Sequence, residues 1–294
     1  MSAASDLLVR SKAPTAPAPK GLGHRLVRIL LVYLPLVFFA GFFLLPLYVV
    51  LVTGFKPFAE VSLQTMWALP STLDFSAFGT AWEKLAPNLL NSLFLVVPGA
   101  IISAIVGSVN GFILSRWRFR GANLLFVLIL FGMFIPYQAI LIPLVQVTKT
   151  LGLYGSIWGL VLVHVIYGIP ITTLTFRNYY AQIPYELVEA ARIDGASMPS
   201  VYRWVFLPLS APGFVVVLIW QFTAIWNDFL FAVVLTGPLS WPVTVALNNI
   251  SGSQIVQWNV QMAAALLAAL PTVVVYLALG RYFLRGMMAG ALKG

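Results

Sequence analysis

Residues 189–208 read EAARIDGASMPSVYRWVFLP, a segment that carries four charged side chains, Glu189, Arg192, Asp194 and Arg203, between two long apolar runs. Each of these charges would cost roughly 2.5–3.5 kcal/mol at the centre of a bilayer, so the segment is not expected to span a membrane. The apolar runs on either side are long enough to do so. A charged segment held between two membrane spans is exposed to water, where a soluble partner can bind it.

The same segment has the local signals of two short helices. Strong helix formers predict a first helix over 185–193. Asp194-Gly195 predicts its end, because glycine adopts the left-handed backbone geometry that closes helices. Pro199 starts a second short helix, which Pro208 is expected to end. The two helices therefore meet at Gly195 and form a small knob.

The composition indicates an all-α, polytopic membrane protein. Of 294 residues, 61% are hydrophobic and 9% are charged, with a mean hydropathy of +0.95, whereas soluble domains have about 25% charged residues. Cysteine is absent, and His24 and His164 are the only histidines, so we expect no metal site. The net charge of +9 is spread beside the apolar runs rather than along one stripe, so we expect no nucleic-acid partner.

Six apolar runs have the length of about 20 residues that a transmembrane helix needs. They lie near 29–53, 88–115, 123–148, 155–176, 212–236 and 260–284. The predicted organisation is a cytoplasmic tail (1–28), a first span with an extracytoplasmic segment (29–87), a transmembrane domain (88–284) that contains the loop 177–211, and a C-terminal tail (285–294). We expect a short helix near 75–85, and a close helix contact at the small pair Gly107 and Gly111.

The basic residues predict the orientation. With the N-terminus in the cytoplasm, only three of the 17 Lys and Arg residues, Lys56, Lys84 and Lys149, fall outside. Cytoplasmic loops carry the excess of Lys and Arg, so the chain is expected to be N-in/C-in. The charged loop then faces the cytoplasm.

The predicted spans are nearly free of charge, and this indicates what could pass if they enclose a path through the membrane. Asp228 is their only acidic residue, and no Lys or Arg lies at mid-depth, which favours a neutral, hydroxyl-rich cargo. The candidate path residues are Gln138, Gln221, Trp226, Asn227 and Asp228. Alternatives remain open, because polar residues in bundles often bond neighbouring helices. Asp228 could be a structural cap or gate, and a histidine such as His164 is more often a packed residue than a ligand.

Three motifs resemble one transporter family. Glu189-Ala190-Ala191, then Gly195, then Val205 and Leu207-Pro208 at the family spacing, resemble the EAA loop of binding-protein-dependent ABC importer permeases. The WNDFL segment at 226–230 and the ending RYFLRGMMAGALKG at 281–294 are similar to carbohydrate importer permeases of the maltose-G type. Residues 248–264 look closer to the glucose/mannose-type branch. The resemblance covers about residues 88–294.

The resemblance implies a type I ABC importer permease (MetI-like) fold in the inner membrane of a prokaryote, as a multi-pass subunit in contact with lipid. It implies a homologous second permease, two copies of an ATPase subunit and an extracytoplasmic sugar-binding protein. The residues that it assigns to ATPase coupling are Glu189, Ala190, Ala191, Arg192, Asp194, Gly195 and Pro208. It also implies that the tail residues Lys293 and Gly294 contact the ATPase.

The chain has no G-x-x-x-x-G-K-[ST] motif, so it is expected not to be an enzyme and to bind no cofactor. The resemblance implies that ATP and Mg are used by the partner ATPase. The predicted function is translocation of a neutral sugar, a monosaccharide such as glucose or mannose or a small oligosaccharide, by alternating access. The alternative is an ion-coupled secondary sugar transporter, which would need intramembrane carboxylates and has only Asp228 to offer.

Overall fold

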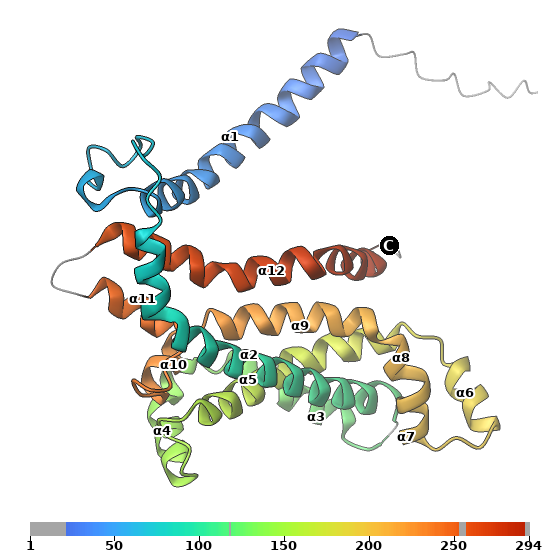
Figure 1. Cartoon of the computed structure of the whole chain (residues 1–294). Coiled ribbons are helices and arrows are strands. Elements are labelled where there is room, and N and C mark those ends of the chain that lie inside the picture. The colour runs from blue at the N-terminus through green and yellow to red at the C-terminus, as the bar shows by residue number, and fades with distance from the viewer. Residues whose placement is uncertain (1–21, 118, 253–256, 292–294) are drawn as a thin grey trace, which may run out of the picture. The chain divides into compact units, whose positions relative to one another are not determined.

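The structure, a computed structural model, describes residues 22–117, 119–252 and 257–291 (Figure 1). Helices make up most of these residues, and their only β pairing is an isolated bridge between Gly155 and Thr236. The all-α prediction is therefore confirmed. The chain divides after Val49 into two units, residues 1–49 and 50–294.

The first unit consists, in its described part, of most of helix α1 (Leu22–Gly54). Its segment Ile29–Gly54 is long and apolar enough to cross a membrane, which agrees with the first predicted span. The helix is apolar on all sides, and large side chains such as Leu31 and Phe43 are exposed. A helix that is apolar all round belongs in lipid or in a protein core.

The second unit is built around four helices: α2 (Ser76–Arg116), α5 (Ile157–Ala181), α9 (Ala211–Trp226) and α12 (Trp258–Ala291). Figure 1 shows α2, α5 and α9 running side by side, and α12 contacts α2 and α9. The approach of α2 to α5 requires glycine, because a Cβ on Gly107 would lie 2.2 Å from Thr172 Oγ1. A Cβ on Gly111 would lie 2.7 Å from the backbone nitrogen of Arg177. The predicted contact at this small pair is confirmed.

The third predicted span, 123–148, is a pair of helices joined at a bend rather than one continuous helix. The chain forms α3 (Ala122–Phe131) and the 3₁₀ turn η2 (Gly132–Phe134), then η3 (Tyr137–Ile140) and α4 (Leu141–Thr150), with a 91° bend between the two halves. Pro136 explains the break, because it lacks an N–H and forces the residue before it out of the helical region. Ile135 is accordingly extended, with ψ 117°.

The fifth predicted span, 212–236, is also divided. Helix α9 ends at Trp226, and α10 (Leu230–Leu235) follows as a separate short helix. Two side chains explain the interruption: Asn227 Nδ2 donates to the Thr223 carbonyl at 2.8 Å, and Asp228 accepts from the first amides of α10. Asn and Asp compete in this way with helix hydrogen bonds.

The connecting segments differ from prediction at one point. The short helix expected near 75–85 is the start of α2, so the second span begins at Ser76 rather than at residue 88. The segment before it contains the 3₁₀ turn η1 (Phe58–Glu60), and the connection after α10 contains α11 (Val243–Ser251). Four single helices and two bent pairs could each cross a membrane by length and composition. The described residues therefore contain four to six candidate spans, and the second bent pair, Met198–Leu209 with Ala211–Trp226, includes part of the charged loop.

Candidate functional site

The charged segment folds as the knob that its sequence predicts. It consists of α6 (Glu186–Ile193), α7 (Met198–Val201), the π-helical η4 (Tyr202–Phe206) and α8 (Leu207–Leu209), and we call residues 186–209 the knob. Gly195 has φ +81°, the left-handed geometry expected of it. The Ala196 amide donates to the Ala191 carbonyl at 2.9 Å and closes α6.

The second helix ends at Leu209, one residue after the predicted end at Pro208. Helical structure continues to Leu209 and bends by 74° at Ser210 before α9 begins. Because Pro208 has no N–H and its ring would clash with a carbonyl one turn earlier, the preceding turn widens into a π-helix. The Leu207 amide accordingly bonds the Tyr202 carbonyl. From the sequence alone, Pro208 could either end the second helix or lie inside a helix that continues past it.

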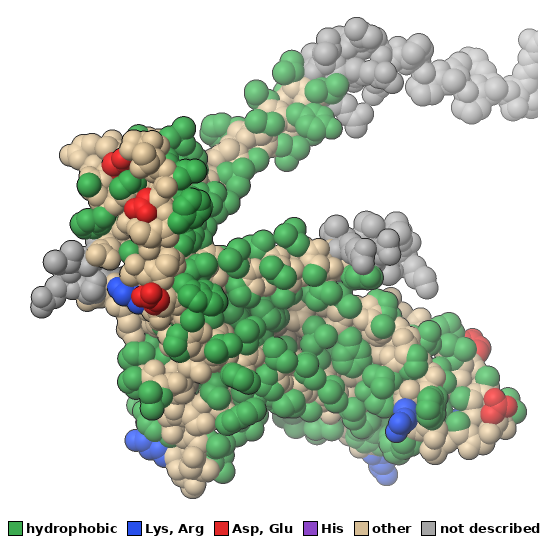
Figure 2. Space-filling view, viewed as in Figure 1, with side chains coloured by type: hydrophobic (Ala, Val, Ile, Leu, Met, Phe, Trp, Pro, Cys, Tyr) green, Lys and Arg blue, Asp and Glu red, His purple; other side chains and the backbone are tan. Residues whose placement is uncertain are grey.

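The knob exposes the side chains expected to contact a partner. Val188 is buried, Ala191 is half-buried, and the exposed members of the predicted set are Glu189, Ala190, Arg192, Asp194, Gly195 and Pro208. Figure 2 shows acidic side chains standing at the α6 end of the molecule. Ile193 (86% exposed) and Trp204 (71% exposed) are the most exposed of the large apolar side chains of the knob.

The base of the knob is anchored to α2 and α5. The Arg116 guanidinium donates to the backbone carbonyls of Tyr180 and Ile183 and lies over the Phe206 ring, 5.3 Å from its centroid. Val188, Val201 and Phe206 are buried together with aromatic residues of α2 and α5. Because these side chains are packed together, a movement of the knob would also displace α2 and α5.

A cavity of about 520 Å³ lies where α5, α9 and α10 meet. Of the predicted path residues, Gln221, Asn227 and Asp228 line it. Gln138 is exposed and lies beside the lining residue Tyr137. Trp226 instead points into the core, where its indole N–H donates to the Ala268 carbonyl at 3.0 Å. The structure therefore brings three of the five candidates together.

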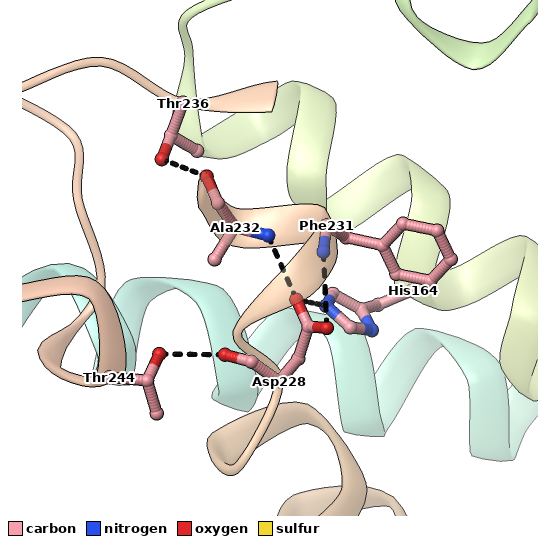
Figure 3. Close-up of polar contacts among 6 residues, drawn as sticks. All are labelled: His164, Asp228, Phe231, Ala232, Thr236 and Thr244. Carbon is pink, nitrogen blue, oxygen red and sulfur yellow. Dashed lines mark hydrogen bonds and ion pairs between the residues drawn. The ribbon is translucent and has the colours of Figure 1, made fainter. Parts of the chain in front are cut away.

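Asp228 is fixed from several sides (Figure 3). Its Oδ1 accepts from the Phe231 amide at 3.3 Å, and its Oδ2 accepts from the Ala232 amide at 3.0 Å, which caps α10. Thr244 Oγ1 donates to the Asp228 carbonyl at 2.6 Å. His164 Nε2 lies 3.3 Å from Oδ2, in ion-pair contact but without the alignment of a hydrogen bond.

The sequence alone did not decide whether His164 is a packed residue or a ligand. It comes from the middle of α5, and no spacing in the sequence connects it to Asp228. The only signal was its polarity inside an apolar span, which in membrane helices indicates a partner or a function. Among the described residues, no three His, Asp or Glu side chains are grouped as a metal site would require. Lys293 and Gly294 lie outside the described residues.

An all-helical chain with four to six candidate membrane spans and an exposed charged knob before α9 has the architecture of a membrane transport subunit. Residues 97–289 match the family described as "Binding-protein-dependent transport system inner membrane component", and the chain belongs to this family. It is thus an inner-membrane permease component of ABC importers, and the family is not the ATPase.

Curated relatives and solved structures agree with this assignment. A probable ABC transporter permease of Pyrococcus horikoshii is 49% identical over 90% of this chain and 97% of its own length. A xylose/arabinose import permease of Haloferax volcanii is 37% identical (88% and 92%), and a glucose import system permease of Saccharolobus solfataricus is 33% identical (87% and 92%). A bacterial alginate-importing ABC transporter chain has the same fold, with a TM-score of 0.80 at 24% identity over 90% of this chain and 99% of that one.

Proposed function

We propose that this chain is the permease subunit of an importer for a neutral sugar, in which a separate ATPase drives alternating access by binding the knob. Relatives named for xylose/arabinose, glucose and alpha-glucoside transport support a sugar as cargo. A related fold occurs in an alginate transporter solved with a sugar-loaded periplasmic protein. The other partners are a homologous second permease, two copies of the ATPase and an extracytoplasmic sugar-binding protein.

The surface of the knob supports ATPase docking. Glu189 and Arg192 are exposed and form no ion pair within the described part of the chain. A free carboxylate such as that of Glu189 is suited to pair with an arginine of the partner in a charge-assisted contact. The distribution of Lys and Arg supports an N-in/C-in orientation, which places the knob on the side where ATP is available.

The charge balance of the cavity supports a neutral cargo. Its one carboxylate, Asp228, is engaged by two backbone amides and by His164, and no Lys or Arg is among the lining residues. A carboxylate held in this way is poorly placed to bind and release a coupling ion. This argues for ATP rather than an ion gradient as the energy source.

The test is reconstitution. We would co-express the chain with its candidate partner permease, ATPase and sugar-binding protein, purify the assembly and measure sugar uptake into proteoliposomes. Uptake should require ATP and should survive an ionophore. Gly195→Arg should abolish both ATPase co-purification and uptake, because the added side chain covers the docking surface.

Gly79→Arg is the matched control, since Gly79 is exposed on α2 and nothing lies within 4 Å of its added Cβ. This variant should retain the ATPase and transport sugar. The proposal fails if no ATPase co-purifies with the unaltered chain. It also fails if Gly195→Arg transports as well as Gly79→Arg, or if uptake continues without ATP and stops with an ionophore.

A further inference from the structure

The turn between α2 and α3 presents aromatic and basic side chains outside the protein core. Residues 116–120 read RWRFR, of which Arg118 lies outside the described residues. Trp117 is 49% exposed, and Phe119 and Arg120 are exposed as well. The guanidinium of Arg120 forms no ion pair with any residue that the structure describes. The turn therefore carries a free positive charge between two exposed rings.

The turn stays close to the membrane surface. Helix α2 and the bent pair α3–α4 are both candidate spans, and only residues 117–121 connect α2 to α3. Five residues reach about 17 Å even when fully extended, so their side chains stay near the depth of the lipid headgroups. The turn lies at the end of the second unit that carries the knob (Figure 1), where Arg116 bonds the carbonyls of Tyr180 and Ile183.

A groove of about 520 Å³ opens at this turn. Trp117, Phe119 and Arg120 line it from the turn, and Asn123 lines it from the first turn of α3. Asn123 is exposed, and its side-chain amide forms no hydrogen bond with a described residue. No Asp or Glu is among the described lining residues. The groove thus offers hydrogen-bond donors and a positive charge that no neighbouring carboxylate offsets.

One rim of the groove continues into apolar surface. Leu124 lines the groove, and Leu128 lies one helical turn further along the same face of α3. Both side chains are exposed, as is Val127. After Asn123, α3 contains only apolar residues. A molecule with a charged head and apolar tails can therefore place its head in the groove and its tails along α3.

We propose that this groove binds the headgroup of an anionic phospholipid. The Arg120 guanidinium donates two parallel hydrogen bonds to the phosphate, and the Asn123 amide donates a further one. The rings of Trp117 and Phe119 lie at the level of the glycerol backbone, as aromatic side chains do at membrane interfaces. Basic pockets between transmembrane helices are known to bind such headgroups. This inference goes beyond the proposed function and does not depend on the cargo.

Three other occupants match the groove less well. The ammonium of a zwitterionic headgroup would find no carboxylate among the described lining residues. A free phosphate ion would pair with Arg120 but would leave the apolar rim at Leu124 uncovered. A soluble protein would have to cover exposed leucines on α3, which is half of a candidate span. An anionic lipid satisfies both the charge and the apolar rim.

The absence of cysteine permits a direct test. Ala122 is half-buried and lines the groove, so Ala122→Cys places a single thiol there. In the purified full-length chain in detergent, we would measure the reaction rate of this thiol with N-ethylmaleimide. The additions are dioctanoyl-phosphatidylglycerol, dioctanoyl-phosphatidylcholine or inorganic phosphate. Phosphatidylglycerol should slow the reaction several-fold, and the other two should change it little.

The three additions separate the possible ligands. Equal slowing by both lipids would show that the groove holds acyl chains without reading the headgroup, and would overturn the inference. Equal slowing by inorganic phosphate and phosphatidylglycerol would make it a site for a free anion rather than for a lipid. Thr150→Cys is the control, because Thr150 is exposed at the end of α4 and outside the groove. Its rate should be the same with every addition.

A charge-matched pair of variants tests the role of Arg120. In the Ala122→Cys chain, Arg120→Gln should raise the phosphatidylglycerol concentration needed for half protection about fivefold. Lys84→Gln removes one positive charge from an exposed position on α2 outside the groove and should leave that concentration unchanged. Equal protection of the two variants would show that Arg120 does not bind the phosphate.

Thermal unfolding gives a second measurement that needs no introduced thiol. A ligand that binds only the folded chain raises its melting temperature. Phosphatidylglycerol should raise it for the unaltered chain and for Lys84→Gln, and less for Arg120→Gln. Arg120→Lys should lie between them, because an ammonium keeps the charge but loses the paired hydrogen bonds. If phosphatidylcholine stabilises the unaltered chain as much as phosphatidylglycerol does, the groove does not select an anionic headgroup and the inference is wrong.

Discussion

The Tyr202 hydroxyl lies 2.9 Å from Ser108 Oγ, which joins the knob to the C-terminal third of α2. Ser108 is fully buried and also lies 2.6 Å from the hydroxyl of Tyr180 on α5. One serine therefore connects three elements, and its hydroxyl can donate to one tyrosine and accept from the other. Buried polar networks that are fully satisfied fix one arrangement of the groups that they join.

This connection predicts that Tyr202→Phe weakens the link between knob and spans while the knob surface stays intact. The lost hydrogen bond should cost about 0.5–1.5 kcal/mol of stability. ATPase co-purification should persist, and sugar transported per ATP hydrolysed should fall, because the knob moves with less effect on α2. Parallel uptake and ATPase assays measure this ratio.

Tyr154→Phe is the control for this experiment, since Tyr154 is 45% exposed and precedes α5. It should leave the ratio unchanged. A Tyr202→Phe assembly that transports as much sugar per ATP as the Tyr154→Phe assembly would show that the hydroxyl link has no part in coupling.

Gly195 tests the backbone geometry of the knob separately from its surface. Nothing lies within 4 Å of a Cβ added there, so Gly195→Ala changes little except the cost of φ +81°. That strain is about 1–2 kcal/mol for a residue with a Cβ. We expect Gly195→Ala to reduce ATPase co-purification and Gly195→Asn to reduce it less, because Asn tolerates this conformation better.

Gly79→Ala is the matched substitution, at a helical glycine with equally open surroundings. It should retain the ATPase fully, since alanine favours a helix over glycine. If all three variants retain the ATPase equally in a pull-down, the left-handed turn is not needed for docking.

A feature of this structure could be predicted from the sequence when the residues that cause it lie close together along the chain. The knob was predictable, because Gly195 and the helix formers before it act over a few residues. The close contact at Gly107 and Gly111 was also visible, since small residues at that spacing lie on one helix face. Local sequence signals and composition are therefore enough to predict most of the helices and the knob.

Breaks within helices, and contacts between residues far apart in the sequence, were harder to predict. The apolar run 123–148 contains Pro136 and Pro143, and the sequence alone does not show whether a proline within a span kinks a helix or divides it. Trp226 and Asp228 are two residues apart, yet the first enters the core and the second faces the cavity, because α9 ends between them. The contact of His164 with Asp228 depends on the packing of α5 against α10, which no local pattern encodes.

The close approach of α2 to α5 predicts strong intolerance at Gly111. A Cβ there would lie 2.7 Å from the Arg177 nitrogen and 2.9 Å from the Phe176 carbonyl carbon, both backbone atoms that cannot rotate away. We expect Gly111→Ala to lower stability by about 1–3 kcal/mol, as overpacking does. Thermal unfolding in detergent should show this loss, and Gly41→Ala, in open surroundings on α1, should show none. Equal melting temperatures would contradict the packing of α2 on α5.

The segment between α1 and α2 predicts a pH dependence. Hydrogen bonds from the hydroxyl and then the amide of Ser71 hold the pKa of the Glu60 carboxyl below its ordinary value, and the nearby Lys56 ammonium adds to this. A carboxyl with a depressed folded-state pKa stabilises the fold above its unfolded pKa, and this stabilisation is lost as pH falls through the folded value. Amide exchange over residues 56–71, corrected for intrinsic rates, should therefore show weaker protection in acid.

Glu60→Gln should remove this pH dependence, because the amide side chain does not ionise. Glu83→Gln, at an exposed glutamate on α2, should keep it. Protection that falls equally with acid in both variants would assign the effect to another group.

The final prediction concerns the two aspartates that bond the first amides of a helix. Asp74 Oδ1 accepts from the Ser76 amide at 2.8 Å in an exposed position, whereas Asp228 accepts from two amides and contacts His164 with a side chain only 13% exposed. Asp228→Ala should cost about 1–2 kcal/mol, the upper part of the range for a lost helix cap, because the amides of Phe231 and Ala232 and the imidazole all lose their partner. Asp74→Ala should cost less, since water replaces its bond, and Asp228→Asn should recover part of the loss through its remaining oxygen. Thermal unfolding of the three variants in one detergent measures the order, and a cost for Asp74→Ala equal to that for Asp228→Ala would mean that α10 does not depend on this cap.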